Sequence, residues 1–245
     1  MYIYHAGGWK GVAETGAPVP DNGHYKNETW PNVEKDHAAQ IELYEDKNVE
    51  TILNLLKELN IDENTITFFA SDNGAHQEGG HQVNFFDSTG GLKGFKRSLY
   101  EGGIRVPMIV RWPGHIPAGL VSDFAWAFWD FLPTALDIAG QPVNMDIDGV
   151  SIVPTLFGKK QEEKDYLYWE FCTNDKWGNA VRKGDWKIVK FAVDAEFELY
   201  NLSTDPKETK NVASEYPAIV EELAEIAKNA HEDNDHFPVK NCVSS

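Results

Sequence analysis

The sequence predicts an α/β fold, in which a parallel or mixed sheet flanked by helices is followed by a small antiparallel sheet and a last helix. Between residues 41 and 140, patterns typical of a helix, a strand, a second strand and a second helix follow one another. From residue 160 on, short strand-like segments with turn residues between them replace this alternation. We therefore expect one part over residues 1–158 and a second over residues 159–245.

The first 59 residues predict a loop and then a helix. Residues 1–30 combine many glycines and prolines with the aromatic residues Tyr2, Tyr4, Trp9 and Tyr25, which is too apolar for disorder and too broken for a helix. Apolar residues then recur every three or four positions from Ile41 to Leu59, and Glu and Lys fill the other face. This spacing predicts an amphipathic helix over residues 41–59.

Two strands and a helix are expected next. The run at 63–71, ENTITFFAS, is rich in β-branched and aromatic residues, and a second strand is expected at 104–114, closed by Pro113 and Gly114. Residues 122–140 fit a helix that Ser122 or Asp123 could cap, with Pro133 starting or kinking its second half. A final helix is expected over residues 217–231, where apolar residues again lie on one side.

Composition excludes some partners. The chain has 245 residues, of which 39 are acidic and 22 basic, so its net charge is -17. Nucleic acids and anionic membranes need a basic surface, so neither is an expected partner. There is also no apolar run of about 18 residues that could span a membrane. The two cysteines, Cys172 and Cys242, predict no disulfide framework and leave the redox compartment open.

The polar pair Asp72-Asn73 directly follows the first predicted strand. Ligands of open α/β sheets collect beyond the carboxyl ends of the strands. A carboxylate and an amide carbonyl are suitable oxygen ligands for a hard cation such as Ca²⁺. The alternative is a simple Asx turn that closes the strand, which the bare sequence Asp-Asn-Gly favours.

A second candidate is Lys96, in the glycine-rich segment GFKRSLYEGGIRVP at 94–107. A lysine beside a bound cation makes a pocket for a tetrahedral oxyanion. The alternative is that Lys93, Lys96 and Arg97 form a solvated basic patch. Glu101 and Arg105 are expected to form a structural ion pair.

Several motifs in a fixed order resemble a known family. The segments ASDNG, GGLKGFKRSLYEGGIRVPMIVRWPGHI and DFLPTALDIAG, with AVRKGDWKIVK and ELYNLSTDPKETKNVA further on, closely resemble the type I sulfatases of the arylsulfatase A and N-acetylgalactosamine-6-sulfatase kind. The resemblance spans about residues 40–235. It implies an alkaline-phosphatase-like mixed sheet flanked by helices, with 1–158 as the C-terminal part of the catalytic domain and 159–245 as a C-terminal subdomain.

The resemblance also implies roles for particular residues. Asp72 and Asn73 match two of the family's calcium ligands, and Lys96 matches the lysine that contacts the sulfate ester. His76 and His81 lie in a loop that borders the substrate pocket in related members, against the alternative of solvated loop histidines. The upstream active-site histidine has no secure match, and His5 is the nearest candidate. Trp9 and Trp30 would line sugar subsites.

One part of the family pattern is missing. The family's formylglycine nucleophile arises from a Cys or Ser in a Cys/Ser-x-Pro-x-Arg motif, and no such motif occurs in these 245 residues. The N-terminal acidic pair of calcium ligands is absent as well. We therefore expect a C-terminal portion of a sulfatase, inactive alone, whose partners are a sulfated small molecule or glycan and the missing N-terminal half of the domain.

Two other functions stay open at this point. The chain could be a non-catalytic fragment or pseudoenzyme, which the missing nucleophile motif favours. It could also belong to another ester hydrolase of the alkaline phosphatase superfamily, although such transition-metal sites need several His and Asp ligands. The compartment is not predicted by the residues, and the family suggests an exported, periplasmic, secreted or lysosomal protein.

Overall fold

The computed structural model describes residues 22–173 and 176–234. Most of the loop predicted at 1–30, with His5 and Trp9, therefore lies outside the described residues. Those described form two compact units. The first unit consists of the described residues up to Leu55, of Ser71–Pro107 and of the described residues from Tyr166 on. The second unit consists of Leu56–Ala70 and Met108–Asp165. The predicted boundary between residues 158 and 159 stays a prediction.

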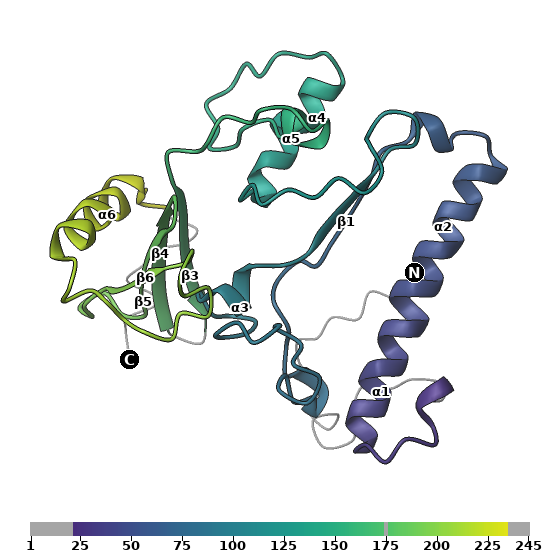
Figure 1. Ribbon diagram of the computed structural model, residues 1–245, viewed down its shortest axis with the longest axis horizontal. Helices are drawn as coiled ribbons and strands as arrows, with labels where there is room; N and C mark the ends of the chain where they lie inside the picture. The colour runs from purple at the N-terminus through teal and green to yellow at the C-terminus, as the bar shows by residue number, and fades with distance from the viewer. Residues whose placement is uncertain (1–21, 174–175, 235–245) are drawn as a thin grey trace. The chain divides into compact units, whose positions relative to one another are not determined.

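A long helical stretch opens the described chain. After a single turn at Gly23–Tyr25, helix α1 (Asn32–Gln40) continues through a π-helical turn (Ile41–Asp46) into α2 (Lys47–Glu58), as Figure 1 shows. The helix thus starts earlier than the predicted Ile41, because α1 is too polar to show a continuous apolar stripe. No residue of α2 is buried, and the side chain of Ile52 on its apolar stripe is 55% exposed.

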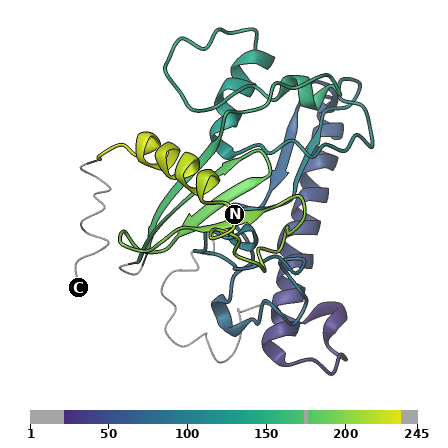
Figure 2. The ribbon, with the colours of Figure 1, turned by 60° about the vertical axis from the view of Figure 1, so that its left-hand side comes forward.

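The C-terminal part of the first unit is an antiparallel sheet, as predicted. Its strands lie in chain order: β3 (Leu167–Thr173), β4 (Lys176–Lys183), β5 (Trp186–Lys190) and β6 (Glu198–Asn201). Gly184 takes a φ of 56° in the two-residue turn between β4 and β5, which glycine adopts without steric cost. Helix α6 (Pro217–Ala230) covers one face of this sheet, as Figures 1 and 2 show.

Alternation along the strands gives this sheet two apolar faces. The face toward α6 is packed by Val181, Ile188, Leu199, Leu223 and Ala227. The opposite face is packed by Leu99, Ala180, Val189, Tyr200 and Leu202. Because Leu99 belongs to the glycine-rich segment, the second face is the support on which that segment is held.

The second unit holds a two-stranded sheet and short helices. Strand β1 (Thr67–Ala70) pairs antiparallel with β2 (Met108–Arg111), and Arg111 makes a bidentate ion pair of 2.6 and 2.7 Å with Asp62. Helices α4 (Phe131–Ile138) and α5 (Val153–Leu156) follow. The buried Asp130 carboxylate accepts hydrogen bonds from the backbone N–H groups of Ala127 and Val150, at 2.7 and 2.9 Å, and from the Lys164 ammonium.

Three elements in the middle of the chain are shorter than predicted. The strand expected at 104–114 is only β2, because Glu101–Ile104 forms the helical turn α3 and Pro107 has no N–H for the ladder. The strand expected at 63–71 is only β1, since Asp62–Asn64 forms a 3₁₀ turn.

The helix expected at 122–140 is also shorter. Only Phe128–Asp130, a 3₁₀ turn, and α4 are helical. The Ser122 hydroxyl accepts a hydrogen bond from the Phe124 N–H in a local turn, and Asp130 closes the helix start instead. Pro133 lies in the first turn of α4, where it is tolerated, and Gly140 follows the helix with a φ of 65°.

Both sheets of the described residues are antiparallel, so the parallel pairing expected in a parallel or mixed sheet is not seen among them, but together with the helices they confirm the α/β class. Cys172 on β3 is disulfide-bonded, although the two cysteines predicted no disulfide framework. None of the helices within 22–173 and 176–234 is long and apolar enough to cross a membrane.

Candidate functional site

Two loops of the first unit, residues 71–81 and 92–103, are held against each other by their backbones. The Gly74 N–H donates to the Gly103 carbonyl at 2.9 Å, and the Lys96 N–H donates to the Ala75 carbonyl at 2.8 Å. A Cβ atom on Gly74 would lie 1.9 Å from the Gly102 carbonyl oxygen, so this approach requires glycine. The structure thus brings the segment with Asp72 and Asn73 next to the segment with Lys96.

Asp72 and Asn73 lie just beyond β1, Asp72 exposed and Asn73 half-buried. Over the described part of the chain, neither the Asp72 carboxylate nor the Asn73 side-chain amide has a hydrogen-bond or ion-pair partner, and the Asn73 carbonyl accepts a 2.8 Å hydrogen bond from Ser71 Oγ. One free carboxylate and one free amide oxygen fit a share of a Ca²⁺ site, which needs six to eight oxygen ligands. The residues described here contain no cluster of three or more His, Cys, Asp or Glu that could hold a metal ion.

Lys96 forms an ion pair with a carboxylate that the sequence did not single out. Its Nζ lies 3.1 Å from Oε2 of Glu78, and Nη2 of Arg97 lies 2.9 Å from Oε1 of the same group. Burial alone would raise the pKa of Glu78, but the hydrogen bond from Lys96 and the charges of Lys96, His76 and Arg97 outweigh it and lower the pKa. Glu78 is therefore ionised and holds two cations.

His76 lies at the centre of this group. Its Nδ1 accepts a 3.1 Å hydrogen bond from the Glu78 N–H, so the neutral ring carries its proton on Nε2. Burial lowers the pKa of His76, and the charges of Lys96 and His81 lower it further, against the opposing charges of Glu78 and Asp72. The ring is thus neutral at neutral pH and is electrically coupled to Asp72 and Lys96.

His81 is placed differently. Its side chain is 2% exposed, and Nδ1 lies 2.5 Å from Oε2 of Glu34, whose Oε1 accepts a 2.9 Å hydrogen bond from the Gln82 N–H. Nε2 lies 3.4 Å from the Ser88 hydroxyl. A substrate contact by His81 stays a prediction, and it would require the ring or its neighbours to move.

Helix α1 contributes two residues that the sequence analysis missed, Glu34 and His37. Their spacing of three places both on one face of the helix, which is the signal that could have found them. The His37 ring stacks on His81 with 3.7 Å between centroids and meets His76 edge-on at 5.7 Å. Burial and the two neighbouring histidines lower the pKa of His37 to about 4.

Aromatic rings continue from the histidines. Phe86 lies 6.1 Å from His81, centroid to centroid, and Trp30 meets Phe86 edge-on at 5.1 Å. Phe85 packs against both, and Tyr25 stacks on Trp30 at 5.6 Å. The predicted sugar-subsite residue Trp30 therefore belongs to an aromatic cluster that adjoins the histidines.

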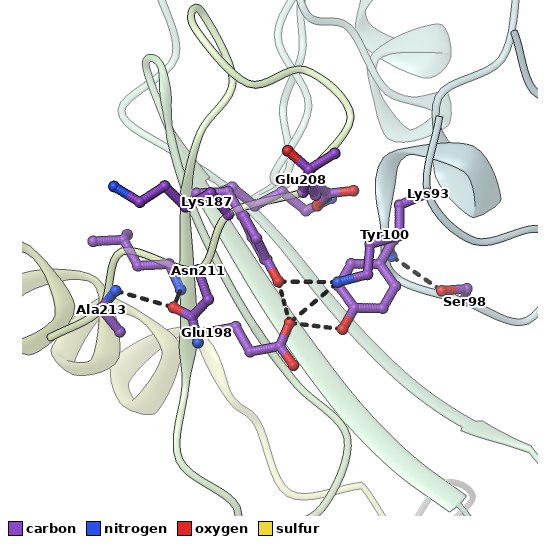
Figure 3. A network of polar contacts seen from close by, with 12 residues as sticks. Lys93, Ser98, Tyr100, Lys187, Glu198, Glu208, Asn211 and Ala213 are labelled. Carbon is purple, nitrogen blue, oxygen red and sulfur yellow. Dashed lines mark hydrogen bonds and ion pairs between the residues drawn. The ribbon is translucent and has the colours of Figure 1, made fainter. Parts of the chain in front are cut away.

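The loop with Lys96 is anchored to the four-stranded sheet at two points, shown in Figure 3. At the first, the Tyr100 and Tyr200 hydroxyls both donate to Oε2 of Glu198, at 2.6 and 2.5 Å. Lys93 Nζ donates to the Tyr200 hydroxyl at 3.0 Å and lies 3.8 Å from the centre of the Tyr100 ring. Lys93 is thus engaged in support and is not a free basic residue.

The second anchor is a buried charge cluster. Lys187 is fully buried, and its Nζ lies 2.8 Å from Glu101 and 2.9 Å from Glu208. Glu208 also accepts a 2.6 Å hydrogen bond from the Glu101 N–H. Arg105 Nη1 is 3.9 Å from Glu101, so the predicted Glu101–Arg105 pair exists but is the weaker one, and Lys187 is the main partner.

Comparison with known proteins gives these loops a context. Residues 24–141 match the Sulfatase family model, and residues 91–233 match the model for N-sulphoglucosamine sulphohydrolase, C-terminal. An N-acetylgalactosamine-6-O-sulfatase from Bacteroides thetaiotaomicron is 30% identical over 206 residues, covering 75% of this chain and 40% of the relative. An N-acetylglucosamine-6-O-sulfatase from the same organism is 33% identical over 215 residues, covering 82% and 36%.

Solved structures agree in fold. A structure in complex with its substrate D-glucosamine-2-N,6-O-disulfate has a TM-score of 0.66 and 28% identity, covering 81% of this chain and 40% of that one. A phosphonate monoester hydrolase from Agrobacterium radiobacter has a TM-score of 0.62 and 26% identity, covering 81% and 41%.

These matches confirm the predicted alkaline-phosphatase-like α/β fold. The chain spans about two fifths of the length of the curated relatives named above. Since one family model covers residues 91–233, more than half of the 245, the chain belongs to the type I sulfatase family.

Proposed function

We propose that this chain supplies part of the active site of a calcium-dependent sulfatase that hydrolyses sulfate monoesters on a sulfated carbohydrate, as one portion of a longer parent chain. The observation that supports this most is the junction of the two loops, which places Asp72 and Asn73 beside the Lys96 segment. The relatives named for 6-O-sulfated amino sugars support the substrate class.

Each residue then has a task. Lys96 binds an oxygen of the ester sulfate and offsets its charge. Asp72 and Asn73 would hold calcium together with ligands from the parent chain, and calcium bound there would stabilise negative charge on the sulfate oxygens. His76, neutral with its proton on Nε2, donates a hydrogen bond to the substrate, and the aromatic cluster around Trp30 offers apolar faces for a sugar ring.

The nucleophile is expected from the parent chain. The 245 residues contain no Cys/Ser-x-Pro-x-Arg motif from which formylglycine could arise. The disulfide at Cys172 fits an oxidising compartment and so supports export, to the periplasm, the exterior or a lysosome.

Two alternative functions are tested alongside the proposed sulfatase activity. A non-catalytic chain is favoured by the missing motif, and a phosphate- or phosphonate-ester hydrolase by the structural likeness to the phosphonate monoester hydrolase. The DNA upstream of Met1 is read for an in-frame nucleophile motif, and the extended chain is expressed with a formylglycine-generating enzyme. Release of sulfate from a 6-sulfated amino sugar, without comparable release from the phosphate analogue, is the expected result. No hydrolysis of either ester by the extended chain would support the non-catalytic alternative.

Calcium binding is tested on the chain itself by calorimetry. Asp72→Ala and Asn73→Ala are each expected to abolish any binding, whereas Asp194→Ala, which removes an exposed carboxylate elsewhere in the same unit, leaves it unchanged. If calcium binds and neither substitution weakens it, the assignment of Asp72 and Asn73 is wrong.

A further inference from the structure

We propose that Glu78 sets the affinity and the charge selectivity of Lys96 for its anionic ligand, by passing from a pair with both Lys96 and Arg97 to a pair with Arg97 alone. The proposal rests on the proposed role of Lys96 in binding the sulfate ester. Glu78 is then a positioning residue, because it acts through Lys96 and does not itself bind the sulfate group.

The Glu78 carboxylate pairs with two cations at once. Each carboxylate oxygen of Glu78 holds one cation: Oε2 holds Lys96 at 3.1 Å and Oε1 holds Arg97 at 2.9 Å. Lys96 can therefore turn to an incoming anion without leaving the half-buried carboxylate unpaired, which would be costly. The Lys96 and Arg97 side chains are 26% and 45% exposed, so the exchange takes place at the surface of the loop, where an anion has access.

The backbone of Arg97 supports this double pairing. Side chains of consecutive residues usually diverge, yet Lys96 and Arg97 reach the same carboxylate. Arg97 has a φ of 75°, the left-handed conformation that non-glycine residues rarely adopt. Strained backbone of this kind is retained where the local arrangement depends on it.

The charges of Lys96, Arg97 and Glu78 together determine which anion this group prefers. Lys96 and Arg97 carry two positive charges and Glu78 one negative charge, so the group has a net charge of +1. A sulfate monoester carries one negative charge and makes the group neutral, whereas a phosphate monoester carries close to two at neutral pH and leaves it negative. His76, whose Nδ1 lies 3.6 Å from Oε2 of Glu78, does not alter this count while its ring is neutral. Glu78 therefore disfavours dianions, in agreement with a sulfatase.

The experiment titrates the full chain with methyl sulfate and, separately, methyl phosphate at pH 7.5, following backbone amide signals of residues 74–103 by NMR. Glu78→Gln is expected to tighten methyl sulfate binding about threefold and methyl phosphate binding about tenfold, as expected for loss of one partly exposed charge. Arg97→Gln is expected to weaken methyl sulfate binding about threefold, because Glu78 loses its second cation and Lys96 must then stay paired with it. Arg97→Lys is expected to restore the native affinity.

Three variants serve as controls. Lys96→Met reports whether binding involves Lys96 at all. Glu225→Gln and Lys228→Gln, made singly, change the net charge by the same amounts at exposed positions on α6, and both are expected to leave binding unchanged. Amide spectra of each variant show whether its fold is retained.

The outcomes separate this proposal from the one on which it rests. If Lys96→Met abolishes methyl sulfate binding but Glu78→Gln leaves both affinities unchanged, the role of Glu78 is wrong and that of Lys96 stands. If Lys96→Met has no effect, or if neither the native chain nor Glu78→Gln binds methyl sulfate, both assignments are wrong. Binding by Glu78→Gln alone, lost again on Lys96→Met, would support both.

Discussion

His37 shows how burial and neighbouring charge act on a single residue of the site. The ring lies between His81 and His76, and burial together with those two histidines lowers its pKa to about 4, against a weaker opposing effect of Glu34. The unfolded chain protonates this ring near pH 6.5, so between about pH 6.5 and 4 the unfolded state binds the additional proton. Stability is thus fully present above this range and is lost as the pH falls through it.

This gives a prediction at the residue scale. NMR titration of the His37 imidazole is expected to show a midpoint near pH 4. Between pH 7 and 4.5 the native chain is expected to lose on the order of 1–2 kcal/mol more stability than His37→Phe, which keeps an aromatic ring but does not titrate. The exposed His115 is the matched control, since His115→Phe replaces a histidine that stacks on Trp112 at the surface. A midpoint near 6.5 for His37 would contradict the packing described for α1.

At the scale of elements, the loop with Lys96 depends on the sheet beneath it. Lys187 is fully buried between Glu101 and Glu208, and burial raises the pKa of Glu208 although Lys187 opposes the rise. Lys187→Met would leave two buried carboxylates without their cation. We expect a loss of about 3–5 kcal/mol in the free energy of unfolding, measured by denaturant titration, with faster amide exchange at Gly102 and Gly103.

The control for Lys187 lies in the same unit. Lys210 pairs with Glu215 at 2.8 Å with both side chains largely exposed, so Lys210→Met is expected to lower the free energy of unfolding far less than Lys187→Met does. Equal effects of the two substitutions would mean that the buried cluster does not hold the loop.

The contact between the loops at residues 71–81 and 92–103 gives a second prediction at the scale of elements. In Gly74→Ala the new Cβ would lie 1.9 Å from the Gly102 carbonyl oxygen, so the loops must separate. We expect this variant to lose stability by about 2 kcal/mol or more and to lose methyl sulfate binding. Gly90→Ala is the comparison: its Cβ would meet nothing within 4 Å, and only its φ of 63° opposes alanine, at about 1 kcal/mol. A smaller effect at Gly74 than at Gly90 would contradict the observed contact.

These elements also show what sequence patterns can predict. A small antiparallel sheet follows from short strand-like segments separated by turn residues, and α6 from the apolar spacing of Ile219, Leu223 and Ala227; both are confirmed. Asp72 and Lys96 are singled out as a carboxylate at a strand end and a lysine in a glycine-rich loop; their roles come from the family resemblance and stay predictions. Lys187 could not be found, because its partner Glu101 lies 86 residues away in the chain. The pairing of Glu34 with His81, 47 residues away, could not be found either, although the spacing of Glu34 and His37 places both on one face of α1.

At the scale of the whole molecule, the two-stranded sheet of β1 and β2 leaves apolar side chains exposed to solvent. Phe69 and Ile109 lie opposite each other in the β1–β2 register, and their side chains are 39% and 63% exposed. A two-stranded sheet has little stability alone and needs a further layer or strand. Because the chain spans about two fifths of its relatives, we propose that this surface is covered by the N-terminal half of the sulfatase domain in the parent chain.

The prediction is that one substitution has opposite effects in two contexts. In the 245-residue chain, Ile109→Thr is expected to reduce self-association and binding of a hydrophobic dye, because it removes exposed apolar surface. In the extended chain the same change is expected to destabilise the fold by about 1–3 kcal/mol, because the side chain is then buried. Val121→Thr, at a side chain 87% exposed in the same unit, is the control and is expected to act weakly in both. If Ile109→Thr stabilises the extended chain or leaves its stability unchanged, the proposed N-terminal half does not cover this sheet.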